Sequence, residues 1–217
     1  DFAKLQPAQQ KVIRNELRDF HLSGIDLSPE QQARYKEIQQ QLSKLASKFS
    51  ENLLDATHGW KKHITEESLL AGLPETAKSL AKQLAEQEHL EGWLLTLDVP
   101  SYQPVLNYAD NRDLREEMYV AYVTRASDQG PQAGKWDNSV LMQDILALRQ
   151  ELATLLDFAN YAEYSLSTKM ANSPQQVFEF LYDLANRSKP IANRDWEELQ
   201  TFAKTHYGVE ILAMWDV

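Results

Sequence analysis

Five histidines are the residues of this chain best suited to hold a metal ion or to act as a base. A zinc hydrolase of the His-Glu-x-x-His type presents both imidazoles on one helical turn, and its Glu activates the zinc-bound water. None of the five is followed by Glu, so this motif is absent from residues 1–217. We therefore assign no catalytic or metal-binding residue, and the substrate-binding residues stay unknown. The histidines are His21, His58, His63, His89 and His206.

Two weaker histidine patterns have ordinary interpretations. His58 and His63 are five residues apart across a Gly-Trp break, and on a helix they would not share a face. We expect surface or capping histidines there rather than a metal pair. Glu86 and His89 have the Glu-x-x-His spacing of di-iron bundles, but such a site needs the motif on two helices and the chain holds it once. A solvated helix end is the favoured interpretation.

Three adjacent pairs of carboxylates occur at 66–67, 116–117 and 197–198. Neighbouring helical residues point in different directions, so these pairs indicate solvated faces rather than acid–base dyads. The chain has neither a Gly-x-Ser-x-Gly nucleophile elbow nor a Gly-rich phosphate loop.

Tyr119 and Tyr122 lie three residues apart, near Arg115 and Arg125. Their hydroxyl and guanidinium groups could line a substrate groove. They could equally be core rings flanked by Arg side chains that reach towards solvent, and core packing is the usual role of aromatics at helical spacing. We favour the core interpretation.

The elements that position these residues are predicted to be mainly helices, because only 7 glycines are available for turns. Ser28-Pro29-Glu30-Gln31 is a capping box with Pro at the first helical position, and Ser173-Pro174 repeats that signal. Asp110 or Asn111, and later Asp137 or Asn138, should cap two further helices. Pro190 should kink or break the last helix. The predicted helices cover about residues 7–20, 29–54, 74–89, 102–108, 111–122, 138–155, 161–170 and 174–208.

Two short stretches favour β-structure. Residues 92–99 are rich in Trp, Leu, Thr and Val and end at Pro100, which is typical of a strand. An isolated strand cannot satisfy its backbone groups, so we expect it to pair with residues 60–64. The predicted fold class is mainly α: a bundle-like, multi-helix lobe with one small two-stranded element around 60–64 and 93–99.

Composition excludes several classes of partner. A net charge of −10 without a Lys/Arg run argues against nucleic acid, since phosphate binding depends on cationic side chains. No apolar run approaches the ~20 residues that span a bilayer, so no membrane is expected. The absence of cysteine excludes disulfides and fits a reducing compartment. The chain lacks an initiator Met and a signal-peptide core, and we expect it to start inside a longer gene product.

Several motifs in register resemble the thimet oligopeptidase / oligopeptidase A family of zinc metallopeptidases. Asp157 stands where many relatives carry Gly, which is a mild departure. The motifs extend over essentially the whole chain: Arg18-Asp19-Phe20-His21-Leu22-Ser23-Gly24, Val99-Pro100-Ser101-Tyr102-Gln103-Pro104-Val105, the stretch from Asn111-Arg112 to Ala126-Ser127, the stretch from Ile145 to Ser165, Lys169-Met170-Ala171-x-Ser173-Pro174, and Met214-Trp215-Asp216.

The resemblance implies a cytoplasmic zinc oligopeptidase of two helical lobes flanking a channel that admits short peptides. It implies that the zinc ligands lie downstream of Trp215-Asp216, so residues 1–217 form one helical segment of the non-zinc lobe. This segment would be a channel wall, inactive alone and free of metal. Its implied partners are short peptide substrates and the missing zinc-bearing lobe. A second copy could dimerise with it through exposed apolar surface.

Two rival interpretations stay open at this point. The chain could be an independent helical scaffold or protein-interaction domain that shares the pattern. It could also be a bundle with a di-metal centre, although we expect no bound zinc or iron.

Overall fold

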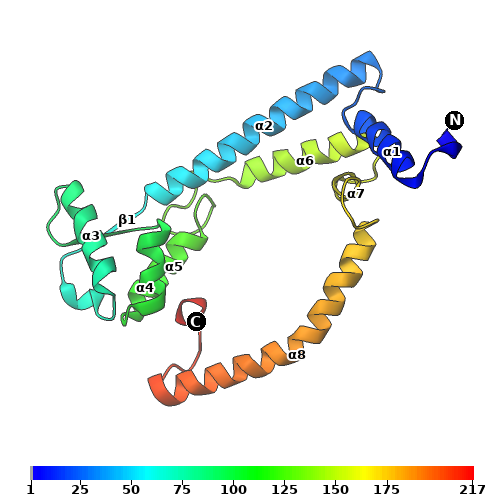
Figure 1. The fold of residues 1–217 in the computed structure, drawn as a ribbon. Coiled ribbons are helices and arrows are strands. Elements are labelled where there is room, and N and C mark those ends of the chain that lie inside the picture. The colour runs from blue at the N-terminus through cyan, green and yellow to red at the C-terminus, as the bar shows by residue number, and fades with distance from the viewer. Residues whose placement is uncertain (1) are drawn as a thin grey trace. The chain divides into compact units, whose positions relative to one another are not determined.

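The structure, a computed structural model, describes residues 2–217, and these are mostly helical (Figure 1). The mainly α prediction is confirmed. The described elements are the helices α1 (Pro7–Leu22), α2 (Pro29–His58), α3 (Glu75–Gln87), α4 (Val99–Tyr108), α5 (Arg112–Val123), α6 (Ser139–Leu155), α7 (Tyr161–Leu166) and α8 (Pro174–Tyr207), the strands β1 (Lys61–Ile64) and β2 (Trp93–Thr96), and the 3₁₀ turns η1 (Phe2–Lys4), η2 (Glu67–Leu70) and η3 (Met214–Asp216).

The helix starts follow the capping signals. The Ser28 hydroxyl accepts from the Gln31 N–H at 3.3 Å, and the Gln31 side chain accepts from the Ser28 N–H at 3.1 Å, which completes the predicted capping box. At α8 the Ser173 hydroxyl accepts from the Gln176 N–H at 3.2 Å. Asn111, the second of its two candidates, caps α5 by accepting from the Leu114 N–H.

Of the two residues predicted to cap α6, Asp137 and Asn138, only Asp137 bonds to the first turn of the helix through its side chain. The Asp137 carboxylate accepts from both the N–H and the hydroxyl of Ser139. Asn138 lies directly before the helix, but its side chain bonds elsewhere: it accepts from Asn52 and donates to the Phe49 carbonyl. A buried amide pair therefore joins α2 to the start of α6 within this part of the chain.

The predicted end of the second strand was wrong. The strand expected to reach residue 99 ends at Thr96, because Val99 and Pro100 begin α4, where Pro fits the first turn of a helix. Of the two outcomes predicted at Pro190, a kink or a break, the break does not occur, since α8 continues as one helix to Tyr207. Pro190 removes one helical N–H, but the helix is exposed on both sides of it, so water can reach the carbonyl that loses its partner.

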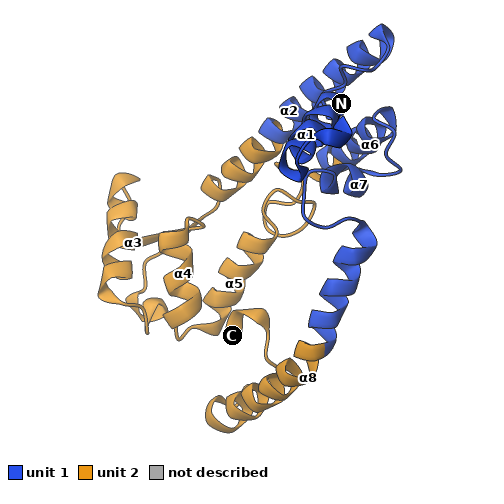
Figure 2. Ribbon diagram, turned by 45° about the vertical axis from the view of Figure 1, so that its right-hand side comes forward, with its two compact units in different colours: residues 1–47, 141–186 blue, residues 48–140, 187–217 orange. Residues whose placement is uncertain are grey.

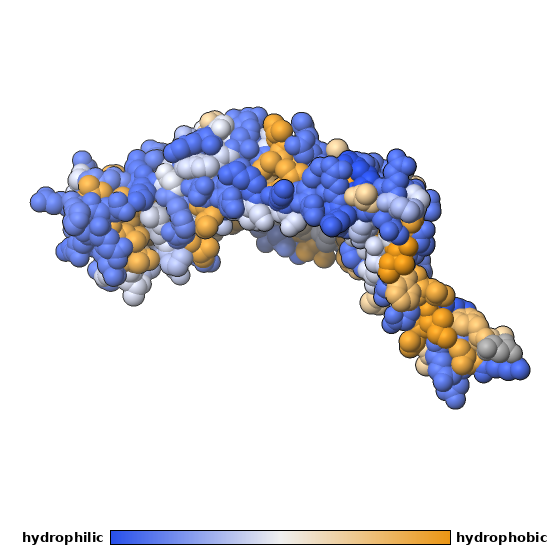
Figure 3. Space-filling model, turned by 90° about the horizontal axis from the view of Figure 1, so that it is seen from above, coloured by the Kyte–Doolittle hydropathy of each residue, from blue (hydrophilic) through white to orange (hydrophobic). Residues whose placement is uncertain are grey.

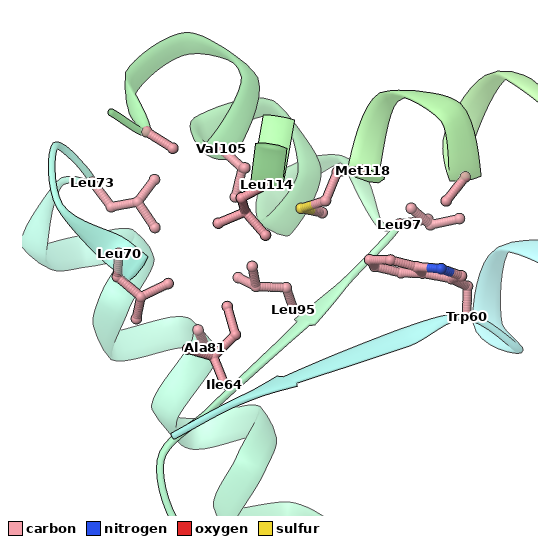
Figure 4. Packing of buried hydrophobic residues seen from close by; sticks show 12 residues of the cluster. Trp60, Ile64, Leu70, Leu73, Ala81, Leu95, Leu97, Val105, Leu114 and Met118 are labelled. Carbon is pink, nitrogen blue, oxygen red and sulfur yellow. The ribbon is translucent and has the colours of Figure 1, made fainter. Parts of the chain in front are cut away.

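The predicted β pairing is confirmed. β1 and β2 are antiparallel, with Lys61 opposite Thr96 and Ile64 opposite Trp93. A two-stranded ribbon is marginal by itself, so it needs a covering layer. Helices α3, α4 and α5 supply that layer, as Figure 4 shows for the side chains between them.

The described chain divides into two compact units (Figure 2). Unit 2, residues 48–140 and 187–217, is built on the β1–β2 ribbon. Leu95 from β2 and Met118 from α5 are at most 2% exposed at the centre of its core. The other buried members of this cluster are Trp60, Ile64, Leu70, Leu73, Ala81, Leu97, Val105, Ala109, Leu114 and Ala121.

Unit 1, residues 1–47 and 141–186, is built on α2 and α6. Ile38 of the predicted α2 seam is fully buried and packs with Leu152 and Leu156. At the surface, Arg34 donates to both carboxylate oxygens of Glu151 at 2.6 and 2.7 Å, a two-pronged ion pair that links the same two helices.

Three helices end in the same hydrogen-bond pattern, with a left-handed residue just beyond the helix. That residue is Gly24 after α1, His89 after α3 and Asp157 after α6, with φ of 74°, 58° and 61°. At each end, the N–H of the next residue donates back to a carbonyl five positions earlier, as in a Schellman motif. Asp157, with its positive φ, therefore occupies a position that favours Gly sterically.

None of the helices within residues 2–217 is both long enough and apolar enough to cross a membrane.

His89→Gly should stabilise the protein by ~0.5–1 kcal/mol, because Gly adopts positive φ without a Cβ clash. His89→Ala should be less stable than His89→Gly, since Ala keeps the clash and lacks the enrichment of His in this region. Urea unfolding of the two variants and the parent protein measures their free energies of unfolding and so ranks their stabilities. A His89→Gly protein that is less stable than His89→Ala would contradict the role given to this residue.

Candidate functional site

The most organised polar cluster of unit 2 lies where the last residues of the chain meet α5. The Asp216 side chain is only 4% exposed. Its oxygens accept from Arg112 Nε and Nη2 at 2.9 and 2.7 Å, from Arg115 Nη2 at 3.0 Å and from the Ala213 N–H at 3.0 Å. A buried carboxylate held by two guanidinium groups and a backbone N–H is fully paired.

Local structure explains how these groups meet. Arg112 and Arg115 are three residues apart on α5, so they share one face of that helix. Arg115 also donates to the carbonyls of Trp215 and Ala109, at 2.8 and 2.7 Å. The Trp215 ring lies 5.7 Å from the ring of Tyr119 on the next turn. The Trp215-Asp216 segment is thus held along α5 through both its side chains and its backbone.

The surroundings set the charge of Asp216. Burial alone would raise the pKa of this carboxyl group. Hydrogen bonds from Arg112, from the Ala213 N–H and from Arg115 outweigh burial and hold the pKa at about 2. Asp216 is therefore ionised at neutral pH.

A groove of about 770 Å³ runs beside this cluster. Apolar residues from the ends of α4 and α8 line it, together with the edges of Arg112 and Asp216. The Trp215 indole N–H is buried and makes no hydrogen bond. Both guanidinium groups are already hydrogen-bonded to Asp216, so the arrangement is suited to hold a chain segment in place. The apolar and aromatic lining residues are Leu106, Tyr108, Ala109, Ala203, Tyr207, Val209, Leu212 and Val217.

The histidines named from the sequence have separate surroundings. In unit 1, His21 contacts Asp26 Oδ2 at 2.7 Å and the Leu156 carbonyl at 3.1 Å. In unit 2, His63 Nε2 contacts the Glu91 carbonyl at 2.6 Å, and His58 lies 3.8 Å from Asp98.

The Glu86-x-x-His89 pattern is not displayed on a helix, because α3 ends at Gln87 and His89 follows in the left-handed region. At the other end of unit 2, His206 packs against Phe202, with ring centroids 4.6 Å apart. Within residues 2–217 no three side chains of His, Cys, Asp or Glu gather into a group that could hold a metal ion.

The carboxylate pairs are engaged singly rather than as dyads. Glu67 lies 3.9 Å from Lys78 Nζ, Glu117 accepts from Lys62 Nζ at 2.8 Å, and Glu198 lies 3.8 Å from Arg194 Nε. The glutamates of these three ion pairs are exposed to solvent, where such contacts contribute little to stability.

The tyrosine–arginine group forms packed contacts. Tyr122 stacks on Tyr102 at 4.1 Å between ring centroids, and the Arg125 guanidinium covers the other face of Tyr122 at 3.5 Å. Tyr102 and Tyr122 both pack against the unit 2 core. This geometry agrees with the core interpretation of Tyr122. Sequence reasoning missed the pairing of Arg112 and Arg115 with Asp216, although both α5 and the Trp-Asp step had been picked out as motifs.

Comparison with known proteins places these features in a family. The sequence profile of peptidase family M3 matches residues 105–217. The chain is 58% identical over 216 residues to oligopeptidase A of Salmonella typhimurium and, equally, to that of Escherichia coli. It is 41% identical over 226 residues to a probable cytosolic oligopeptidase A of Arabidopsis thaliana. These alignments cover all of this chain but only 31–32% of each relative, so the chain spans about a third of their length.

Asp216→Asn should destabilise the protein by ~2 kcal/mol at neutral pH, since the folded pKa lies about 2 units below the ordinary value of 3.8. A lowered pKa gives stability that is present above pH 3.8 and is lost as pH falls towards 2. The difference between parent and variant should therefore shrink over that acid range. Urea unfolding at several pH values measures it.

Asp195→Asn is the matched control, because Asp195 pairs with Arg194 at the exposed surface of α8. Its effect should stay within ~0.5 kcal/mol. Equal destabilisation by both substitutions would contradict the special role of Asp216.

Proposed function

Because the chain belongs to peptidase family M3, we propose that it is part of a zinc-dependent oligopeptidase that hydrolyses short peptides. The observation that carries this proposal is the 58% identity to bacterial oligopeptidase A over the full length of the chain. Identity at this level, spread over 216 residues, supports a shared fold and a shared role for the segment. The probable cytosolic relative supports a cytoplasmic location.

The described residues do not fit a zinc site. They contain no group of ligating side chains, and the sequence has no His-Glu-x-x-His. The best-placed imidazole, that of His21, already contacts an acceptor with each ring nitrogen. We infer that the zinc ligands belong to parts of the longer polypeptide outside residues 1–217, and we derive no catalytic step from this segment.

We propose that the segment acts as part of a channel wall in the non-zinc lobe, where it limits access sterically. Its long helices suit that role: α2 has 30 residues and α8 has 34, which correspond to ~45 and ~50 Å at 1.5 Å per residue. Helices of this length can exclude folded proteins while leaving room for an extended peptide. Short peptides are then the substrate of the whole enzyme.

Exposed apolar surface supports a partner for this segment. Ala203 is the only buried residue of α8, whereas nine of its large apolar side chains are 38–74% exposed. Apolar residues also gather along α1 (Figure 3). Such surface is normally covered, and we propose the zinc-bearing lobe as its cover, with self-association when that lobe is missing. The exposed residues on α8 are Phe178, Phe180, Leu181, Tyr182, Leu184, Ile191, Trp196, Phe202 and Tyr207.

The complete gene product should bind zinc and hydrolyse a short quenched fluorescent peptide, and a chelator should abolish this activity until zinc is restored. The same cleavage sequence placed in a loop of a folded carrier protein should resist, because the channel excludes it. Elemental analysis and initial rates measure both effects. Residues 1–217 alone should show no hydrolysis.

Different failures have different meanings. Chelator-insensitive hydrolysis by the complete protein would remove the zinc peptidase proposal. Equal cleavage of the peptide and the folded carrier would remove the channel-wall role only. Hydrolysis by residues 1–217 alone would show that the catalytic groups lie within this segment.

A further inference from the structure

The contacts of His21 are unusual because both of its ring nitrogens face acceptors. Nδ1 lies 2.7 Å from the Asp26 carboxylate, and Nε2 lies 3.1 Å from the Leu156 carbonyl. Neither a carboxylate nor a carbonyl can donate a hydrogen bond. Both contacts are favourable only if both nitrogens carry protons, which means that the ring is the imidazolium cation.

The charges around His21 favour that cation. His21 is in the last turn of α1, and Leu156 directly follows the last residue of α6, so two helix carboxyl ends meet at one ring. The partial negative charge at a helix C-terminus attracts a cation. The charged groups that raise the pKa of His21 are Asp26, in the loop before α2, and Asp157, in the turn after α6.

Few other contacts hold α1 in place. The helix has no buried residue, and Val12, Leu17 and Phe20 are all more than half exposed. The neighbouring Leu22 carbonyl accepts from the Tyr35 hydroxyl of α2 at 3.1 Å. The Phe158 ring lies 6.4 Å from the His21 ring. The two polar contacts of His21 are therefore a large share of what joins the end of α1 to α6.

We propose that His21 is a proton-dependent clasp, which fastens the end of α1 to the end of α6 while its ring is charged and loosens when the ring loses a proton. A neutral imidazole donates from only one nitrogen. The lone pair of its other nitrogen then faces an oxygen acceptor, so one of the two hydrogen bonds is lost. The clasp does not depend on the proposed peptidase activity. It makes the stability of the turn between α1 and α2 depend on pH, independently of any catalytic role.

The direction of the effect follows from linkage. Hydrogen bonding to Asp26, followed by the Leu156 carbonyl and the nearby carboxylates, raises the pKa of His21 above 6.5 against a smaller opposing effect of burial. A raised pKa gives stabilisation that is complete below pH 6.5 and is lost as pH rises through the folded value. The clasp should therefore loosen as pH rises above 6.5 and through the raised pKa of His21.

Hydrogen exchange followed by mass spectrometry tests this in the complete gene product. The reporter is the peptide that covers residues 20–26, because the Gly24 and Ile25 N–H groups donate to the His21 and Phe20 carbonyls at the end of α1. After correction for intrinsic rates, its protection should be greatest below pH 6.5 and should fall as pH rises through the raised pKa of His21. The fall should be about tenfold for each unit by which the pKa is raised. Nitrogen-15 spectra at pH 6 should show both ring nitrogens protonated.

Three variants make the test specific. His21→Gln should remove the pH dependence. Asp26→Asn should move the loss of protection to lower pH, and it stays informative if His21→Gln fails to fold, because the Asp26 side chain is 57% exposed. His206→Gln is the matched control, since His206 is an exposed histidine of unit 2, and it should leave the profile unchanged.

Flat protection in the parent protein, or an unchanged transition in His21→Gln or in Asp26→Asn, would overturn the proposal. The measurement involves no peptide hydrolysis, so its failure is distinguishable from failure of the peptidase proposal.

Discussion

The carbonyl groups at the ends of the long helices are the constraint on which much of this structure depends. Each helix leaves several carbonyls without helical partners, and a chain with only 7 glycines has few easy ways to satisfy them. Unit 1 solves this at two ends that face each other: Gly24 turns the chain after α1, and Asp157 turns it after α6. The Leu156 carbonyl then contacts His21 instead of water. The need to satisfy carbonyl groups at helix ends thus places the titratable side chain of His21 between the ends of α1 and α6.

Local sequence signals predicted helix starts better than helix ends. The Ser28 and Ser173 caps depend on residues within one turn, and both formed where the pattern put them. The ends of α2 and α7 were predicted near residues 54 and 170 but lie at His58 and Leu166. The left-handed turns at His89 and Asp157 use residues that tolerate positive φ without demanding it, so the residue types there do not predict this geometry. The start of α4 was misplaced because Pro100 fits a strand end and a first helical turn equally well.

Long-range contacts were beyond reach of pattern reasoning. The Arg112–Asp216 pair joins residues 104 positions apart, and the His21–Leu156 contact joins residues 135 apart. Periodicity predicts which face of a helix is apolar, as it did for Ile38, but it does not say which distant segment will meet a given charge. The β1–β2 pairing is the exception, because an isolated strand must find a partner and only one other stretch was available.

The motifs that identify the family are therefore mainly structural in this segment. Pro100 begins a helix, Asn160 caps α7 by accepting from the Glu163 N–H, and Ser173 caps α8. Asp216 holds the end of the chain against α5 through two arginines. None of these residues belongs to a group of side chains that could hold a metal ion among residues 2–217. A segment can thus be recognisable as part of an enzyme because its helices must start, stop and pack at fixed places. The proposed peptidase chemistry is therefore a question for the complete gene product rather than for these motifs.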